Sequence, residues 1–207
     1  MKMENSIRYK VFILLGILFI GCSTKRFNIN EVDFSHKEMP QSILPLRYYD
    51  RSNINPETAE KIVKGVLATD SNVWGYYYIH HAVDRKEIGL FSFEIFGIPI
   101  TDILVFLGMP KSRVYYDMTA DIYLFDSNGD IIEIDEKTTT IMKYKGFYYG
   151  HNPPIKEMSE EYKKMFDEIV NKINGNKVQI NNFLESAGIL EEEYSPEVYT
   201  KIYKIIK

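Results

Sequence analysis

The residues best suited to binding a metal ion are few in this 207-residue chain, and they are not at ligand spacings. His80 and His81 are adjacent, with Asp84 and Glu87 nearby. The segment 73–81 is aromatic and β-branched, which predicts a strand. Neighbouring side chains of a strand point to opposite faces, so two such imidazoles do not easily share one ion. We therefore expect surface or hydrogen-bonded histidines and assign no metal site.

A second candidate for ion binding is the segment Asp126-Ser127-Asn128-Gly129-Asp130. A calcium loop requires glycine at its sixth position and glutamate at its twelfth, whereas here Gly129 is fourth and Lys137 is twelfth. Asn-Gly between two apolar runs is a strong signal for a β-hairpin. The sequence predicts a hairpin turn at this point and no calcium site.

Aromatic residues make up 14% of the chain, and many of them are clustered. Exposed aromatic rings can stack on sugar or peptide, so these clusters are candidates for a binding surface. On a strand, however, half of each cluster would point into the core. The candidate binding residues are Trp74, Tyr76, Tyr78, Tyr115 and Tyr148.

Recognisable catalytic motifs are absent from the sequence. It contains no glycine-rich phosphate loop and no G-x-S-x-G turn around a nucleophilic serine. The acidic run Glu191–Glu193 is typical of a solvated helix flank, although folding can still bring two carboxylates together. We name no catalytic residue and no cofactor, and we favour a protein that is not an enzyme. The net charge of -4 argues against a nucleic-acid partner.

The N-terminus has the pattern of a secretory signal peptide. A short basic region is followed by the apolar run Val11–Ile20, which has the length of a signal-peptide core and is too short to span a bilayer. The end of this run, Leu18-Phe19-Ile20-Gly21-Cys22, resembles the lipobox of bacterial lipoproteins, with Phe19 where that family usually has leucine. The resemblance implies that residues 1–21 are removed and that Cys22, the single cysteine, receives acyl chains such as palmitate. A plain signal peptide, or an uncleaved anchor, is the alternative.

Downstream of Cys22, the sequence predicts a tether at 22–45 and one domain at 46–207, whose part 156–207 is helical. Removal of residues 1–21 would leave 22 basic and 28 acidic residues. A mildly acidic domain is not attracted to an anionic membrane surface, so we expect membrane contact through the acyl chains and not through a basic face.

Apolar periodicity and turn signals predict an α+β fold, with an antiparallel sheet forming a hairpin or meander around 120–144 and short helices packed on it. The segment Ile88–Met109 holds Glu94 and Asp102, and we divide it into a strand and a short helix instead of a membrane span. In that helix, Ile103 and Leu107 belong to the stripe expected to be buried. Strands are predicted at 73–81, 89–96, 122–125, 131–135 and 137–144. Helices are predicted at 56–68, 101–107, 159–175 and 179–187 and from 195 onward. Asn55 is the expected N-cap of the first, and Ser159 is that of the third, whose apolar face runs from Tyr162 to Ile173.

The segment Gly97–Pro110, a capped apolar helix closed by Leu-Gly-Met-Pro, is similar to a helix signature of the SmpA/OmlA-like lipoproteins. The following segment Ile122–Asp135 resembles the last hairpin of that family. The resemblance covers about 40 of the 207 residues. It implies two small helices on a three-stranded antiparallel sheet, and an accessory role in outer-membrane β-barrel assembly. The C-terminal helical third has no counterpart in that family, and strand-like sequence separates the two helices.

These observations lead to an expectation for function. We expect a lipid-anchored cell-envelope protein, in the outer membrane and facing the periplasm, that binds another envelope component such as a protein. Surface exposure on the cell is a second location. The alternative functions are an envelope hydrolase that uses carboxylates and a structural surface lipoprotein. An enzyme should show a cleft with converging acids of perturbed pKa, and a binding module an exposed aromatic or apolar patch.

Overall fold

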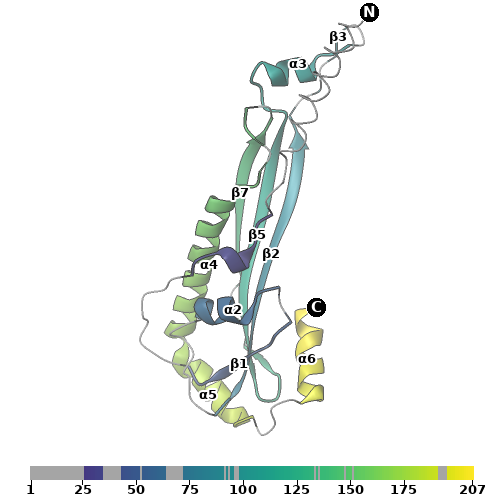
Figure 1. Cartoon of the computed structure of the whole chain (residues 1–207). Helices are drawn as coiled ribbons and strands as arrows, with labels where there is room; N and C mark the ends of the chain where they lie inside the picture. Colours follow the sequence, from purple (N-terminus) through teal and green to yellow (C-terminus); the bar gives the residue numbers. More distant parts are fainter. Residues whose placement is uncertain are drawn as a thin grey trace, which may run out of the picture.

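We describe a computed structural model of the chain (Figure 1). The predicted signal peptide 1–21 and Cys22 lie outside the residues that the structure describes. The described residues are 26–34, 43–51, 53–63, 72–90, 92, 94–95, 98–132, 134, 136–146, 148–150, 152–190 and 195–207.

Two long strands form the centre of the fold. Strand β2 (Gly75–Gly89) pairs antiparallel with β5 (Ser112–Asp126) over all 15 residues of each strand. At about 3.3 Å per residue, this ladder is roughly 50 Å long. The predicted strand 73–81 therefore continues to Gly89. The charged run Asp84–Glu87 would interrupt a buried strand, but it lies where the strand is exposed and still has a partner in β5.

The remaining strands complete a curled, mostly antiparallel sheet. β1 (Leu46–Tyr48) pairs parallel with β2, and β6 (Ile131–Ile132) and β7 (Lys137–Lys145) both pair with the other edge of β5. The predicted Asn-Gly hairpin is confirmed: Gly129 has φ +74°, and the backbone N–H of Gly129 donates to the carbonyl oxygen of Asp126 at 3.1 Å. β7, the strand that follows β6 in the chain, pairs with β5 and not with β6.

The α+β class and the helical C-terminal region are confirmed. The N-cap predicted before the first helix is also confirmed, because Asn55 accepts a hydrogen bond from the backbone N–H of Thr58 at 2.8 Å. Ser159 is not the cap that we predicted: its helix begins at Ile155, and its hydroxyl donates to the carbonyl of Ile155 one turn back. The helices are η1 (Ile29–Glu31), α2 (Pro56–Val63), α3 (Thr101–Phe106), α4 (Ile155–Gly175), α5 (Lys177–Ala187) and α6 (Pro196–Ile206).

Helices cover both faces of the basal part of the sheet, and they stop short of the opposite ends of β2, β5 and β7 (Figure 1). On one face, α4 contributes a stripe of buried residues that includes Tyr162, Phe166 and Ile169, and η1, α2 and α5 join the same core. On the other face, α6 packs Ile202 against Tyr76 and Phe125. The helices thus hold one end of the long ladder, and the other end projects beyond them.

The segment before residue 46 contributes to this core. Ile29, Phe34 and Ile43 are buried, and the ring of Phe27 stacks on that of Tyr162 with centroids 5.2 Å apart. The segment predicted as a tether at 22–45 is therefore not a tether throughout, because its described part packs against the sheet and α4. This packing was not visible in the sequence, because the apolar residues of 22–45 are scattered and follow neither a helical nor an alternating period.

The projecting end of the sheet differs most from expectation. In the described part of the predicted strand 89–96, Leu90 and Ser92 belong to no strand, and Glu94–Ile95 (β3) pairs with Ile98–Pro99 (β4) in a separate small hairpin, followed at once by α3. Phe91, Phe93 and Phe96 lie outside the described residues. β3, β4 and α3 lie beyond the ends of β2, β5 and β7 (Figure 1). We call this part of the molecule the distal end.

Replacement of Gly75 should test how strictly the β2–β5 ladder is positioned. A Cβ atom at residue 75 would lie 2.0 Å from the carbonyl oxygen of Phe125 and 2.9 Å from the Cα of Asp126, and backbone cannot move aside as a flexible side chain can. We expect Gly75→Ala to lower the free energy of unfolding by about 2 kcal/mol or more. Urea unfolding followed by fluorescence measures this change.

Gly89, at the opposite end of the same strand, provides the matched control. A Cβ atom there meets nothing within 4 Å. Gly89→Ala should leave stability unchanged or slightly raised, because alanine has less freedom in the unfolded chain. Equal destabilisation by the two variants would contradict the pairing described here.

Candidate functional site

Exposed apolar side chains are concentrated at the distal end. Of the twelve large hydrophobic side chains that are exposed among the described residues, eight lie there or on the adjoining strand ends. Phe106 is 61% exposed, Leu107 is 72% exposed and Tyr148 is 64% exposed. Scattered apolar residues are normal on a protein surface, but a concentration of them marks an interaction site. We call this set the distal apolar surface: Ile88, Ile103, Phe106, Leu107, Met109, Met142, Tyr148 and Tyr149.

Local contacts hold this surface together at the end of the sheet. Gly108 ends α3 with φ +106°, a conformation that favours glycine, and its carbonyl accepts a hydrogen bond from the Tyr149 hydroxyl at 3.3 Å. The ring of Tyr149 lies 5.9 Å from that of Tyr144 on β7. The connection after α3 is therefore attached to the last residues of the sheet.

The helix at 101–107 corrects one expectation from the sequence. We predicted that Ile103 and Leu107 would be buried, but Ile103 is 56% exposed, and Leu107 is more exposed still. The apolar stripe exists in the sequence, but α3 lies past the ends of β2, β5 and β7, so it does not pack on the large sheet (Figure 1). Sequence reasoning thus missed the residues of the distal apolar surface, apart from Tyr148. The available signal was the composition of 88–110, where only Glu94 and Asp102 are charged.

Basic residues occupy the strand ends next to this surface. Segments 85–90, 111–116 and 141–146 lie side by side in the sheet and together hold six basic residues and a single acid, Glu87. This local excess contrasts with the net charge of -4 for the whole chain. We call the six residues the basic band: Arg85, Lys86, Lys111, Arg113, Lys143 and Lys145.

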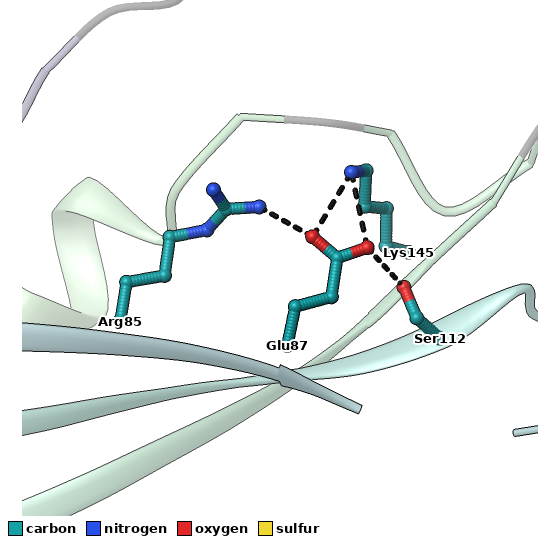
Figure 2. A network of polar contacts seen from close by, with 4 residues as sticks. All are labelled: Arg85, Glu87, Ser112 and Lys145. Atoms are coloured by element: carbon teal, nitrogen blue, oxygen red, sulfur yellow. Dashed lines mark hydrogen bonds and ion pairs between the residues drawn. The ribbon is translucent and has the colours of Figure 1, made fainter. Parts of the chain in front are cut away.

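The single acid of this region is held by a polar network that spans three strands (Figure 2). The carboxylate of Glu87 accepts hydrogen bonds from the Ser112 hydroxyl at 2.7 Å and the Arg85 guanidinium at 2.7 Å, and both of its oxygens lie 3.1 Å from Nζ of Lys145. The Ser112 hydroxyl, with the help of Lys145 and Arg85, holds the pKa of Glu87 below its ordinary value. The network connects β2, β5 and β7 next to the distal end.

A cavity of about 790 Å³ lies on the α4 side of the sheet, near this network. Phe27, Tyr116 and Met158 give it apolar and aromatic walls, and Arg26 adds a further cation to Arg85 and Lys145. Such a lining suits an anionic group attached to an apolar one. His81 also lines this cavity, and neither nitrogen of its ring has a hydrogen-bond partner among the described residues. Burial, and secondly the nearby His80, lowers the pKa of His81 from 6.5 to about 4.

The aromatic residues proposed from the sequence are not brought together. Tyr76 and Tyr78 are buried beneath α6 and cannot form an exposed stacking surface. Trp74 is half-buried against the main core, next to the basal end of β2. Tyr115 is half-buried on β5 near the strand end, and Tyr148 belongs to the distal apolar surface.

The carboxylates give no arrangement suited to hydrolysis in the described part of the chain. Burial raises the pKa of both Asp121 and Asp126, but these residues are five apart on β5 and point to opposite faces. Asp126 accepts hydrogen bonds from the backbone N–H groups of Asn128 and Asp130, as in a turn. Among the described residues, no group of three or more His, Cys, Asp or Glu side chains is placed to hold a metal ion.

Fold and surface together define the class of this molecule: an α+β protein with a long, curled, mostly antiparallel sheet, helices at the basal end and an apolar distal end. No protein-family model matches the chain, and no curated protein matches it in sequence. The resemblance of Gly97–Pro110 to the SmpA/OmlA-like lipoproteins therefore stays a prediction. None of the described helices is both long and apolar enough to cross a membrane.

His81 should make the stability of the protein depend on pH. Its pKa is about 4 in the folded protein and near 6.5 when unfolded, so the unfolded chain binds the extra proton first as the pH falls. The native state is therefore fully favoured above pH 6.5 and loses stability between 6.5 and 4. From pH 7 to pH 5 we expect a loss of about 2 kcal/mol from this residue.

Urea unfolding of the wild type and of His81→Phe at pH 7 and pH 5 measures this contribution. Phenylalanine keeps a ring against Tyr162, whose ring centroid lies 5.9 Å from that of His81, and it cannot be protonated. The difference in the free energy of unfolding between pH 7 and pH 5 should be smaller in this variant than in the wild type. His80→Gln removes only the secondary cause of the low pKa and should retain most of the difference. If His81→Phe behaves as the wild type does, His81 is not the group responsible.

Proposed function

We propose that this chain is a lipid-anchored cell-envelope protein that acts by binding another envelope component through its distal apolar surface. The anchor is Cys22, acylated after removal of residues 1–21, and the location is the outer membrane, facing the periplasm. The concentration of eight exposed apolar side chains at the distal end is the observation that carries the binding role. A surface of this kind, built on a rigid three-stranded support, is suited to docking and not to chemistry.

The two alternative functions are less well supported. A hydrolase that uses carboxylates needs two acids near one cleft, and the two carboxyl groups with raised pKa point to opposite sides of β5. A purely structural lipoprotein has no need to expose apolar side chains to solvent, where they promote aggregation. Accessory binding accounts for the exposed surface without any catalytic group.

Acylation of Cys22 is the first part of this proposal to test. In a bacterial host that processes lipoproteins, we expect labelled palmitate to be incorporated into the full-length protein and lost in Cys22→Ser. The chain has one cysteine, so no other thiol can take its place. Equal labelling of the two proteins, or none of the wild type, would remove the anchor from the proposal.

Photo-crosslinking in intact cells tests the binding role. A photoreactive phenylalanine analogue in place of Leu107 should give an adduct with an envelope component, whether protein or lipid. The same analogue in place of Val178, which is 67% exposed at the basal end, is the matched control and should give none. If both positions, or neither, give adducts in correctly anchored protein, the distal apolar surface is not the binding surface.

A further inference from the structure

We propose that the distal apolar surface inserts into a lipid bilayer whose surface is anionic, the same bilayer that holds the acylated Cys22. This inference rests on the proposed function and names the component that the surface binds. Three independent observations lead to it: the shape of the apolar surface, the charge beside it, and the place where the described chain begins.

The apolar surface has the form of an interfacial insertion and not of a protein groove. Two of its three most exposed members, Phe106 and Leu107, are at the end of a helix of only six residues, which is far too short to span a bilayer. Tyr148 and Tyr149 lie against Gly108, the residue after Leu107, and tyrosine is enriched where hydrocarbon meets lipid headgroups. Such a surface is suited to entering the outer part of one leaflet, to the depth of about 5–10 Å that amphipathic segments reach.

Charge complementarity points to phospholipid headgroups as the neighbours of this surface. The basic band lies on the strand ends next to the apolar side chains, so it would be level with the headgroups once those side chains were inserted. Its single acid is already neutralised by contacts with Arg85, Ser112 and Lys145 (Figure 2). Each exposed Lys or Arg near an anionic surface strengthens binding about fivefold.

The start of the described chain places the anchor near the same band. Arg26 and Phe27 line the cavity together with Arg85 and Lys145, and Phe27 is held there by stacking on Tyr162. Cys22 precedes Arg26 by four residues, a span of at most about 14 Å. From Arg85 to Gly89, the last residue of β2, is about 13 Å along the strand. An anchored Cys22 thus keeps the distal end within reach of the bilayer that holds it.

A fluorescence experiment with pure lipid tests the proposal. We would use the mature chain from residue 22 with Cys22→Ser, so that neither acyl chain nor signal peptide contributes to binding. A single cysteine is then introduced as Leu107→Cys and labelled with a dye that is bright in an apolar environment. We expect a blue-shifted and brighter emission with vesicles of phosphatidylglycerol and phosphatidylethanolamine, and quenching by lipids that carry a quencher in the acyl chain. Val178→Cys, labelled identically, should respond to neither.

Unlabelled variants measure the two parts of the surface in a vesicle flotation assay. Phe106→Ser combined with Leu107→Ser should weaken binding at least tenfold, because two large apolar side chains leave the bilayer. Lys86→Gln with Lys111→Gln should also weaken it at least tenfold, and added salt should do the same. The basal pair Lys177→Gln with Lys204→Gln is the charge-matched control and should have no effect. Glu87→Gln should strengthen binding. Far-UV circular dichroism and urea unfolding establish that each variant is folded.

Each result decides for or against the proposal. Burial of the Leu107 probe in pure lipid, with the salt and variant effects above, supports it. No response to vesicles overturns it, and if position 107 still gives a protein adduct in cells, the proposed binding function stands with a protein as its target. A probe response that rises with protein concentration and needs no lipid identifies a second copy of the chain, and also overturns it. If position 107 gives neither lipid burial nor a cellular adduct, both proposals fail.

Discussion

The pairing of β2 with β5 is the interaction on which the other features of this protein depend. Each strand uses all 15 of its residues in this ladder, so the two strands stay together well past the point where the helices stop. A two-stranded ribbon of this length would be marginal in water. Here α2, α4 and α5 cover one face of its basal half and α6 the other, and β7 adds a third strand along the distal half. The helices that stabilise the fold pack near one end of the sheet, and the paired strands extend from there into solvent.

This division explains why the same sheet is apolar at its base and charged near its distal end. At the base, Ile79 and Ile122 face each other across β2 and β5 and are buried under the helices. Toward the distal end the α4 side of the sheet stays buried on the central strand, where Val114 and Tyr116 belong to the core. Their partners on β2, Glu87 and Arg85, are exposed and take part in a polar network. The exposed side chains of the distal apolar surface belong to neither cluster of buried residues. Its members Ile88 and Met142 lie in the same strand segments as the basic band.

The sequence revealed the features that depend on neighbouring residues and missed those that depend on distant ones. The Asn55 cap, the turn at Gly129 and the apolar stripe of α4 are local patterns, and the structure confirms them. The length of β2 depends on β5, which lies more than twenty residues away, so the aromatic and β-branched pattern that ends at residue 81 gave the wrong strand end. An apolar stripe on a short helix predicts burial only where another element packs on it. The sequence of α3 does not tell whether a packing partner exists, and the structure leaves Ile103 and Leu107 exposed. Tyr78 was assigned to a binding surface for the same reason, because α6 reaches it from the far end of the chain.

Net charge is a poor guide to what an elongated protein can bind. Charges in solution are screened over about 8–10 Å at physiological ionic strength, whereas the β2–β5 ladder is about 50 Å long. A surface that approaches the distal end reaches the basic band before it reaches the acids of α5 and α6 at the base of the sheet (Figure 1). Our expectation that the domain, with 22 basic and 28 acidic residues after removal of 1–21, would not contact the membrane through a basic face treated its charge as evenly spread. Because the sheet places six basic residues on neighbouring strand ends with Glu87 as the single acid among them, that part of the surface is locally cationic although the protein is acidic, and the adjoining β3 and α3 carry the acids Glu94 and Asp102.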